Sequence, residues 1–424
     1  MKKGLVVLSV IASTMLMASY PIGDAGYKLD GSHEQTQSTS TVKVGETFGE
    51  ALKKGKFTAA LRTFYFDRSF DEDKTGNADA RALTFGGIIK YESAAYYGFK
   101  FGLAHYSSTR LGNIFTREEG KGTSMLGREG QNLAFLGEAY VQYDIGNTML
   151  KVGRQQLATP LMQNHDLRIL PSVYEAAILR NKDIPDTMIE IGFVDRYTGF
   201  TSKENAFLDT KTGKDGLAYI SASNTSIENL ILHAQYIDAL TDTNTRQSYT
   251  YADAKYNLPF GTNTYIKGQF GMNEYLEGKD STLVGAKIGT TIGMFSIAAL
   301  YDKISDNAFQ AFESGPMYSD WQQGYGPYEA STAFGGQLVI KPMAGLSVKF
   351  GYVDVQSDTD KLVDDFTEFN LDAKYTINDW SKIRVRYSIK DQSNASEALR
   401  FDGVDDNGGR EDRDDFRVQY YVNF

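Results

Sequence analysis

The sequence predicts an all-β fold, a transmembrane antiparallel β-barrel of about eighteen strands. Three observations predict it: apolar and polar residues alternate with period two, short and long connections alternate, and the last strand ends on an aromatic residue. The composition agrees, because 27 Tyr, 25 Phe and 41 Gly favour strands and tight turns, and Pro numbers only 8. Cysteine is absent, which excludes disulfides and thiolate metal sites.

The first residues predict export. Lys2 and Lys3 precede an apolar run, residues 4–18, that ends on a small residue, which is typical of a secretory signal peptide over residues 1–18. A membrane anchor is the alternative, although the run is short for a spanning helix. We expect a polar leader over residues 19–55, with a short amphipathic helix within residues 45–55, and the barrel over residues 56–424.

Period-two alternation marks the strands, since only every second residue of a barrel strand faces lipid. The expected strands, in chain order, are residues 56–66, 81–92, 98–106, 133–144, 148–156, 173–179, 188–196, 216–223, 229–238, 248–256, 263–272, 282–289, 294–302, 334–341, 346–355, 366–377, 381–390 and 416–424.

The connections between these strands alternate in length. Long polar segments such as residues 107–132 and 303–333 are separated by short ones such as residues 145–147 and 343–344. An outer-membrane barrel sorts its connections in this way, because its periplasmic turns are short and its outward loops are long. A large secreted sandwich or jelly roll is the alternative, and it gives no reason for the alternation.

The two faces of a strand indicate which side meets lipid. In residues 381–390, Ile383 and Val385 share one face, whereas Arg384 and Arg386 share the other. A mid-bilayer cation that faced lipid would cost about 2–4 kcal/mol, so the charged face is expected to line a lumen. The final strand would pair with the first and close the sheet.

Two patterns bear on the lumen of the predicted barrel. In residues 346–355 the alternation fails at Val353, which we interpret as the strand leaving the membrane. The chain is acidic, with a formal charge of −10, yet its predicted lumen face is rich in cations. Rows of Arg and Lys in a pore favour anions. The alternative is that these cations pair with luminal acids, for which the candidates are Glu138, Glu190, Asp253 and Asp372.

Three segments carry a family resemblance. Residues 61–70, 84–104 and 151–177 resemble the OprD-type substrate-specific outer-membrane porins, and residues 151–177 are the most specific of them. The resemblance implies an 18-stranded barrel narrowed by an inward-folded third loop, residues 157–172, and seventh loop, residues 303–333. It also implies an Arg/Lys ladder that guides carboxylate-bearing solutes. The predicted solute pathway consists of Arg62, Lys90, Lys151, Asp166, Arg168, Lys267, Lys287, Lys349, Lys374, Arg384, Arg386 and Arg417.

The predicted function is passive, selective diffusion of small anionic or carboxylate-containing solutes, without enzymatic activity, cofactor or metal. A weakly selective diffusion porin is the alternative, followed by an outer-membrane adhesin or enzyme. Expected partners are outer-membrane lipid, lipopolysaccharide and, as the resemblance implies, the barrel-assembly machinery that reads Phe424. Nucleic acid is not expected, because the basic residues alternate along strands instead of forming a patch. Monomer and homotrimer both stay open.

Overall fold

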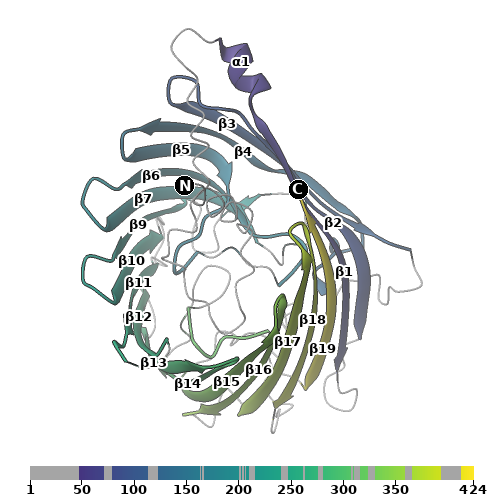
Figure 1. Cartoon of the computed structure of the whole chain (residues 1–424), viewed down its shortest axis with the longest axis vertical. Coiled ribbons are helices and arrows are strands. Elements are labelled where there is room, and N and C mark those ends of the chain that lie inside the picture. The colour runs from purple at the N-terminus through teal and green to yellow at the C-terminus, as the bar shows by residue number, and fades with distance from the viewer. Residues whose placement is uncertain are drawn as a thin grey trace, which may run out of the picture.

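The computed structural model of the 424-residue chain shows a closed wall of strands around a lumen (Figure 1). The predicted signal peptide, most of the predicted leader and Asp166 lie outside the residues that the structure describes. The described residues are 47–70, 79–112, 123–162, 164, 167–199, 202, 205, 207–209, 215–239, 247–260, 263–275, 280–306, 309, 316–322, 330–358, 365–392 and 412–424.

Nineteen strands of the described residues form one antiparallel sheet, and all except the two-residue β8 build the wall, so eighteen strands close the barrel as predicted. The strands are β1 (Lys56–Phe70), β2 (Ala80–Glu92), β3 (Phe99–Arg110), β4 (Leu133–Ile145), β5 (Thr148–Gln155), β6 (Val173–Asn181), β7 (Thr187–Thr198), β8 (Leu208–Asp209), β9 (Leu217–Asn224), β10 (Leu230–Ala239), β11 (Gln247–Asn257), β12 (Tyr265–Tyr275), β13 (Ser281–Ile292), β14 (Phe295–Asp306), β15 (Ser331–Met343), β16 (Leu346–Ser357), β17 (Phe366–Asn378), β18 (Ser381–Gln392) and β19 (Arg413–Asn423).

The first and last wall strands pair and leave no free edge. β1 pairs with β19 from Ala60 opposite Asn423 to Phe70 opposite Arg413. Beyond the strand, the Phe424 backbone N–H donates to the Ala59 carbonyl at 3.0 Å, which continues the ladder to the last residue. The well-patterned C-terminus is therefore the closing strand of the barrel.

Three of the short connections are two-residue turns that contain glycine. The β4–β5, β13–β14 and β15–β16 turns contain Gly146, Gly293 and Gly345, whose φ angles are 56°, 59° and 80°. Glycine suits these positions because two-residue hairpin turns of this kind need positive φ. The alternation of short turns with long connections at the other end of the barrel agrees with the prediction.

A short helix precedes the first strand, as expected. α1 (Phe48–Lys53) begins after Thr47, whose side chain accepts a hydrogen bond from the Glu50 backbone N–H. The Phe48 ring packs edge-on against Phe101, with centroids 5.5 Å apart. Among the described residues, no helix has the length and apolar character that a membrane span requires.

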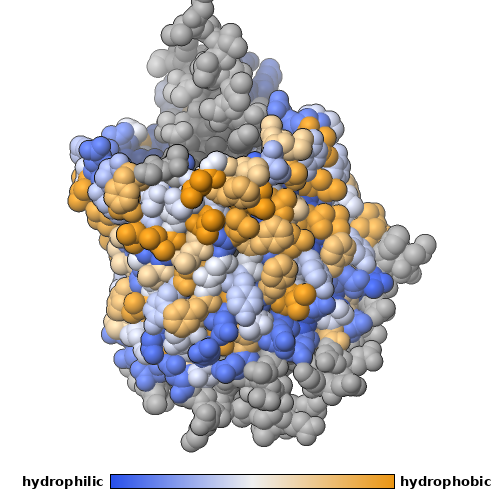
Figure 2. All heavy atoms as spheres, turned by 60° about the horizontal axis from the view of Figure 1, so that its bottom comes forward, coloured by the Kyte–Doolittle hydropathy of each residue, from blue (hydrophilic) through white to orange (hydrophobic). Residues whose placement is uncertain are grey.

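The wall is apolar outside and polar inside. On β18, Ile383 and Ile389 are exposed, whereas Arg384 and Arg386 are buried toward the lumen. Figure 2 shows one side of the wall, where hydrophobic residues gather in a broad band and hydrophilic residues gather toward one end. Apolar side chains therefore face outward and charged side chains face the lumen, as predicted.

Most strands extend beyond the predicted limits, and these limits are corrected. β1, β3 and β14 continue four residues further, to Phe70, Arg110 and Asp306, and β15 and β19 begin at Ser331 and Arg413, three residues earlier than the alternation indicated. The hydrophobic alternation ends where lipid contact ends, but backbone pairing continues toward the outward side. The long connections are shorter by the same amount.

Part of the lumen is filled by an apolar core, which the sequence did not predict. Leu161 and Met162 of the third loop and Met317 of the seventh pack with Leu283 and Val353 of the wall. Val353 is fully buried on the inner face of β16, which continues past it to Ser357, so the break in the alternation there coincides with the apolar core. Apolar side chains of the inward loops pack here against apolar residues on the inner face of the wall.

A second inner cluster lies near the β1–β4 wall. Met125 and Leu126, from the connection between β3 and β4, pack with Ile169 and Leu170 of the third loop and with Phe66 of β1. The Ser108 hydroxyl donates to the Met125 carbonyl at 2.6 Å and fixes this connection inside the barrel. The connection between β3 and β4 therefore also enters the lumen, in addition to the third and seventh loops.

Candidate functional site

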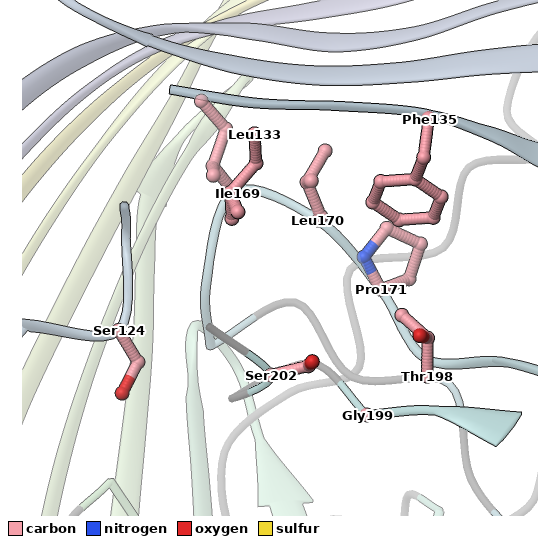
Figure 3. A pocket seen from close by; sticks show the side chains of 9 residues that line it. All are labelled: Ser124, Leu133, Phe135, Ile169, Leu170, Pro171, Thr198, Gly199 and Ser202. Atoms are coloured by element: carbon pink, nitrogen blue, oxygen red, sulfur yellow. The ribbon is translucent and has the colours of Figure 1, made fainter. Parts of the chain in front are cut away.

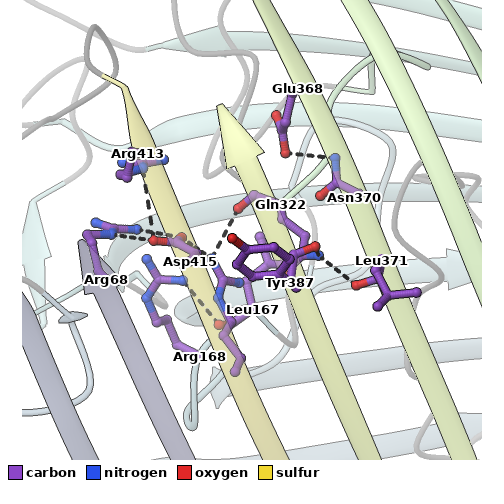
Figure 4. Close-up of polar contacts among 11 residues, drawn as sticks. Arg68, Leu167, Arg168, Gln322, Glu368, Asn370, Leu371, Tyr387, Arg413 and Asp415 are labelled. Atoms are coloured by element: carbon purple, nitrogen blue, oxygen red, sulfur yellow. Dashed lines mark hydrogen bonds and ion pairs between the residues drawn. The ribbon is translucent and has the colours of Figure 1, made fainter. Parts of the chain in front are cut away.

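Three arginines contact one carboxylate at the seam between β19 and β1, and Arg168 of the third loop and Arg386 of β18 lie near them (Figure 4). Asp415 accepts from Arg68 Nε at 2.8 Å and Nη2 at 3.0 Å, and from Arg417 Nη2 at 2.7 Å. Arg413 Nε lies 4.0 Å from the same carboxylate. We call the following five residues the arginine cluster: Arg68, Arg168, Arg386, Arg413 and Arg417.

The Phe66 ring packs against three of the arginines in this cluster. The guanidinium carbons of Arg417, Arg168 and Arg68 lie 4.5, 4.9 and 5.1 Å from its centroid. A fully buried ring attracts cations through its face, which stabilises positive charge where water is scarce. One ring therefore holds three guanidinium groups on three different segments of the chain.

Positive charges lie close to one another in the arginine cluster. Burial lowers the pKa of the Arg168 guanidinium well below its usual range, and the nearby positive charges of Arg417 and Arg68 lower it further. Arginine stays protonated in proteins. Burial and the neighbouring positive charges therefore make the binding of an anion beside Arg168 favourable.

Hydrogen-bonding capacity also remains in the cluster. Arg417 Nε and Nη1 and Arg168 Nε are buried and have no hydrogen-bond partner in the described part of the chain. A guanidinium fork matches a carboxylate, which can accept two parallel N–H groups. The cluster can therefore bind a carboxylate-bearing or other small anion.

The cluster continues into a row of charged side chains on the neighbouring strands. Across β16, β17, β18 and β19, Lys349 lies opposite Asp372, Asp372 opposite Arg386, and Arg386 opposite Arg417. Asp372 accepts from Arg384 Nε at 2.7 Å and Nη2 at 2.6 Å. The predicted alternative, pairing with luminal acids, thus holds for Arg384, while the row as a whole keeps an excess of cations.

The remaining predicted cations lie elsewhere on the inner wall, in smaller groups. Lys90 pairs with Glu138 at 2.9 Å, and Lys151 Nζ lies 3.7 Å from the Tyr140 ring centroid. The predicted acid partners Glu190 and Asp253 pair instead with Arg180 and His233, which are not among the predicted pathway residues.

Two lysines face each other on this wall, away from the cluster. Lys267 of β12 lies opposite Lys287 of β13, and Lys287 Nζ donates to Gln337 Oε1 at 3.1 Å. Lys374, on β17, lies opposite Arg384. The predicted pathway residues that the structure describes therefore all belong to the inner wall or the third loop, but only Arg168, Arg386 and Arg417 meet in the cluster.

The third loop crosses the lumen, as the resemblance implied. At one end the Leu161 backbone N–H donates to Gln235 Oε1 of β10 at 2.9 Å, and Gln235 Nε2 donates to Thr159 Oγ1 at 2.9 Å. At the other end Arg62 Nη1 of β1 donates to the Arg168 carbonyl at 3.0 Å. Wall strands far apart in sequence thereby place Arg168 beside the β19 arginines.

The seventh loop also folds inward where the structure describes it. The Ser319 backbone N–H and hydroxyl both donate to Asp302 of β14, and Arg417 Nη2 donates to the Gln322 carbonyl at 3.3 Å. The third and seventh loops therefore both touch the arginine cluster.

Arg68, Arg413 and Asp415 were missed by the sequence reasoning. They lie outside the predicted strand limits, in segments assigned to long loops. A signal was present, because Arg413, Asp415 and Arg417 follow one another at the two-residue spacing of one strand face.

The sequence profile described as outer membrane porin, OprD family, matches residues 49–331, which is 283 of 424 residues. The chain belongs to the OprD family of outer membrane porins. The family assigns the protein to the bacterial outer membrane as a channel and not an enzyme.

Solved structures agree on the fold of this OprD-family porin. OpdK of Pseudomonas aeruginosa is 18% identical, with a TM-score of 0.72, over 88% of this chain and 99% of OpdK. OccK9 (OpdG) of Pseudomonas aeruginosa is 16% identical, with a TM-score of 0.74, over 88% of this chain and 99% of that one. A further structure, of OpdK with vanillate, is 16% identical with a TM-score of 0.72, over 88% of this chain and 99% of that one. The comparison with curated proteins found no match.

A small pocket of the porin lies at the end of the third loop (Figure 3). Leu133 and Phe135 of β4 and the Ile169–Leu170–Pro171 stretch line it, with Thr198 opposite. Its lining is mostly apolar and holds no charged side chain, so it does not compete with the arginine cluster as an anion site. In the described ranges, no group of three or more His, Cys, Asp or Glu residues could hold a metal ion.

Proposed function

We propose that this porin gives small anionic or carboxylate-containing solutes, such as amino acids and small organic acids, passive and selective diffusion across the outer membrane. The observation that carries the proposal is the arginine cluster, with three guanidinium groups within 4.0 Å of Asp415 and N–H groups without a hydrogen-bond partner on Arg168 and Arg417. Both inward loops touch this cluster, so a solute that passes between them meets it.

Attraction over a series of sites lets an anion move without being trapped. One charge pair at 4 Å is worth about 4 kcal/mol at an effective dielectric constant of 20. Arg386 and Lys349 continue the positive potential along the wall, so a carboxylate can exchange one cation for the next. Asp372 and Asp415 lower the total attraction, which keeps release possible.

The solved structure of OpdK with vanillate supports a carboxylate solute, because vanillate is an aromatic carboxylate.

Planar-bilayer recordings test the proposal. With a KCl gradient, the reversal potential of the wild-type channel should indicate anion preference, and benzoate should interrupt the current more than uncharged benzyl alcohol does. Arg168→Gln and Arg386→Gln should weaken both effects. The control is Arg196→Gln, because the Arg196 side chain is 51% exposed and pairs with Asp195 and Glu175 away from the cluster.

The alternative is a weakly selective diffusion porin. That alternative would be favoured if neither Arg168→Gln nor Arg386→Gln changed the ion preference and if benzoate did not change the current. Cation preference in the wild type would overturn the proposal.

Partners at the two surfaces of the barrel are part of the same proposal. The apolar band contacts outer-membrane lipid and, on the outward side, lipopolysaccharide. Phe424, with 72% of its side chain exposed, is free to be read by the barrel-assembly machinery. The monomeric and homotrimeric states both remain open predictions.

A further inference from the structure

A short inner part of the seventh loop, residues 316–322, is tied to the wall at three points, and the first is a carboxylate. Asp302 Oδ2 accepts from the Ser319 backbone N–H and from the Ser319 hydroxyl, both at 2.7 Å. Its other oxygen accepts from Gln269 Nε2 at 2.7 Å. Asp302 is fully buried, so these bonds are shielded from water.

Space for the carboxylate comes from a neighbouring strand. A Cβ atom on Gly285 would lie 2.2 Å from Asp302 Oδ1 and 2.5 Å from Gln269 Nε2. Only glycine at this place on β13 leaves Asp302 and Gln269 in their present positions. The wall is thus shaped to present Asp302 to the loop.

The second attachment is the Trp321 ring, which occupies the space left by the missing side chain of Gly351. The Trp321 ring lies where a side chain at Gly351 of β16 would be, since a Cβ there would come within 1.9 Å of Trp321 Cζ3. Trp321 packs with Leu300 and Tyr318 and is almost fully buried, and its Nε1 donates to the Tyr318 carbonyl at 3.1 Å. The ring therefore fixes the position of the segment over β14 to β16.

The third tie reaches the arginine cluster. Arg417 Nη2 donates to the Gln322 carbonyl at 3.3 Å, and Gln322 Nε2 lies 3.4 Å from the carbonyls of Leu371 and Tyr387 (Figure 4). These contacts are longer than those of Asp302, so they hold the segment less firmly. The contact with Arg417, at Gln322, lies three positions after the firm attachment at Ser319.

We infer that Asp302 is a positioning residue that anchors residues 316–322 against the wall and thereby sets how much of the lumen beside the arginine cluster stays open. The carboxylate touches no cation of the cluster through a hydrogen bond and faces the loop instead. Its role is mechanical: it fixes the place of Gln322 relative to Arg417. The inference requires a conducting barrel and rests on the proposed function only for its selectivity readout.

Loss of the carboxylate should release the segment. Asp302→Ala removes the acceptor of two buried hydrogen bonds from Ser319 and leaves both donors without it. Conductance should rise because the loop no longer narrows the passage, and anion preference should fall because solutes pass farther from Arg417. Gly351→Leu offers an independent release, since its side chain would occupy the Trp321 site.

Single-channel conductance and cysteine labelling together test the inference. The chain has no Cys, so Met317→Cys provides one label site in the segment, where Met317 is 1% exposed. A membrane-impermeant maleimide added to folded protein should label this site at least about tenfold faster with Asp302→Ala than without it. The matched control is Asp358→Ala, which removes a carboxylate paired with Lys303 at the loop end of β16.

The outcomes separate this inference from the proposed function. Faster labelling and larger conductance with Asp302→Ala, and neither with Asp358→Ala, support the anchor even in a channel that shows no anion preference. Unchanged labelling and conductance in folded, heat-modifiable Asp302→Ala and Gly351→Leu proteins would overturn it, whatever the ion preference of the wild type.

Discussion

Replacing Asp415 by Asn should weaken the barrel and strengthen its preference for anions at the same time. Asp415 is fully buried and bonds to Arg68 on β1 and Arg417 on β19, so its charge joins the two strands that close the barrel. Breaking a buried ion pair costs about 3–5 kcal/mol, because the partner charge is left uncompensated. Asn keeps the shape and one acceptor oxygen, so we expect a loss near the lower end, about 3 kcal/mol.

Urea unfolding of the purified protein, followed by tryptophan emission, measures this loss. The double variant Arg68→Gln/Asp415→Asn removes both charges of the seam pair, so its loss should be smaller than the sum of the single losses by about 1–3 kcal/mol. Strict additivity, or a single loss below about 0.5 kcal/mol, would refute the argument that the pair stabilises the seam.

The same variant makes a separate prediction for transport. In the Asp415→Asn protein, Arg68, Arg413 and Arg417 lose the negative charge that they share. The reversal potential in a KCl gradient should therefore move toward stronger anion preference, and benzoate should interrupt the current for longer. An unchanged reversal potential would place the cluster off the path of the ions.

Two further predictions concern the outer surface and the chain end. Ile288→Arg places a cation on the lipid face between Ile266 and Ala299, and should destabilise the folded barrel by about 2–4 kcal/mol in urea unfolding from lipid vesicles, whereas Lys267→Arg in the lumen should leave it unchanged. A stable Ile288→Arg protein would contradict the lipid-facing assignment of that side. Phe424→Ala keeps the backbone bonds to Ala59, so stability should change by less than about 0.5 kcal/mol while the yield of assembled barrel in cells falls. Phe57→Ala, equally exposed at 72% and located on β1, is the matched control, and an equal fall in yield for both would argue against a specific signal at the C-terminus.

The sequence by itself determined the wall of this protein. The alternation in residues 381–390 assigns Ile383 to lipid and Arg384 to the lumen, because the cost of a cation in hydrocarbon applies to each residue separately. Turn glycines and the length of each connection follow from equally local rules, so the number of wall strands and the closing role of the C-terminal strand were both predictable.

Only the tertiary structure decided what fills the lumen and where the cations meet. Arg68 and Asp415 are 347 residues apart and become neighbours only when β1 pairs with β19 in one register. Val353 faces an apolar core because two loops fold onto it, which no period in its own strand can indicate. A local pattern reports the solvent on each side of a strand, whereas the contacts inside the barrel depend on which distant segments the closed sheet brings together.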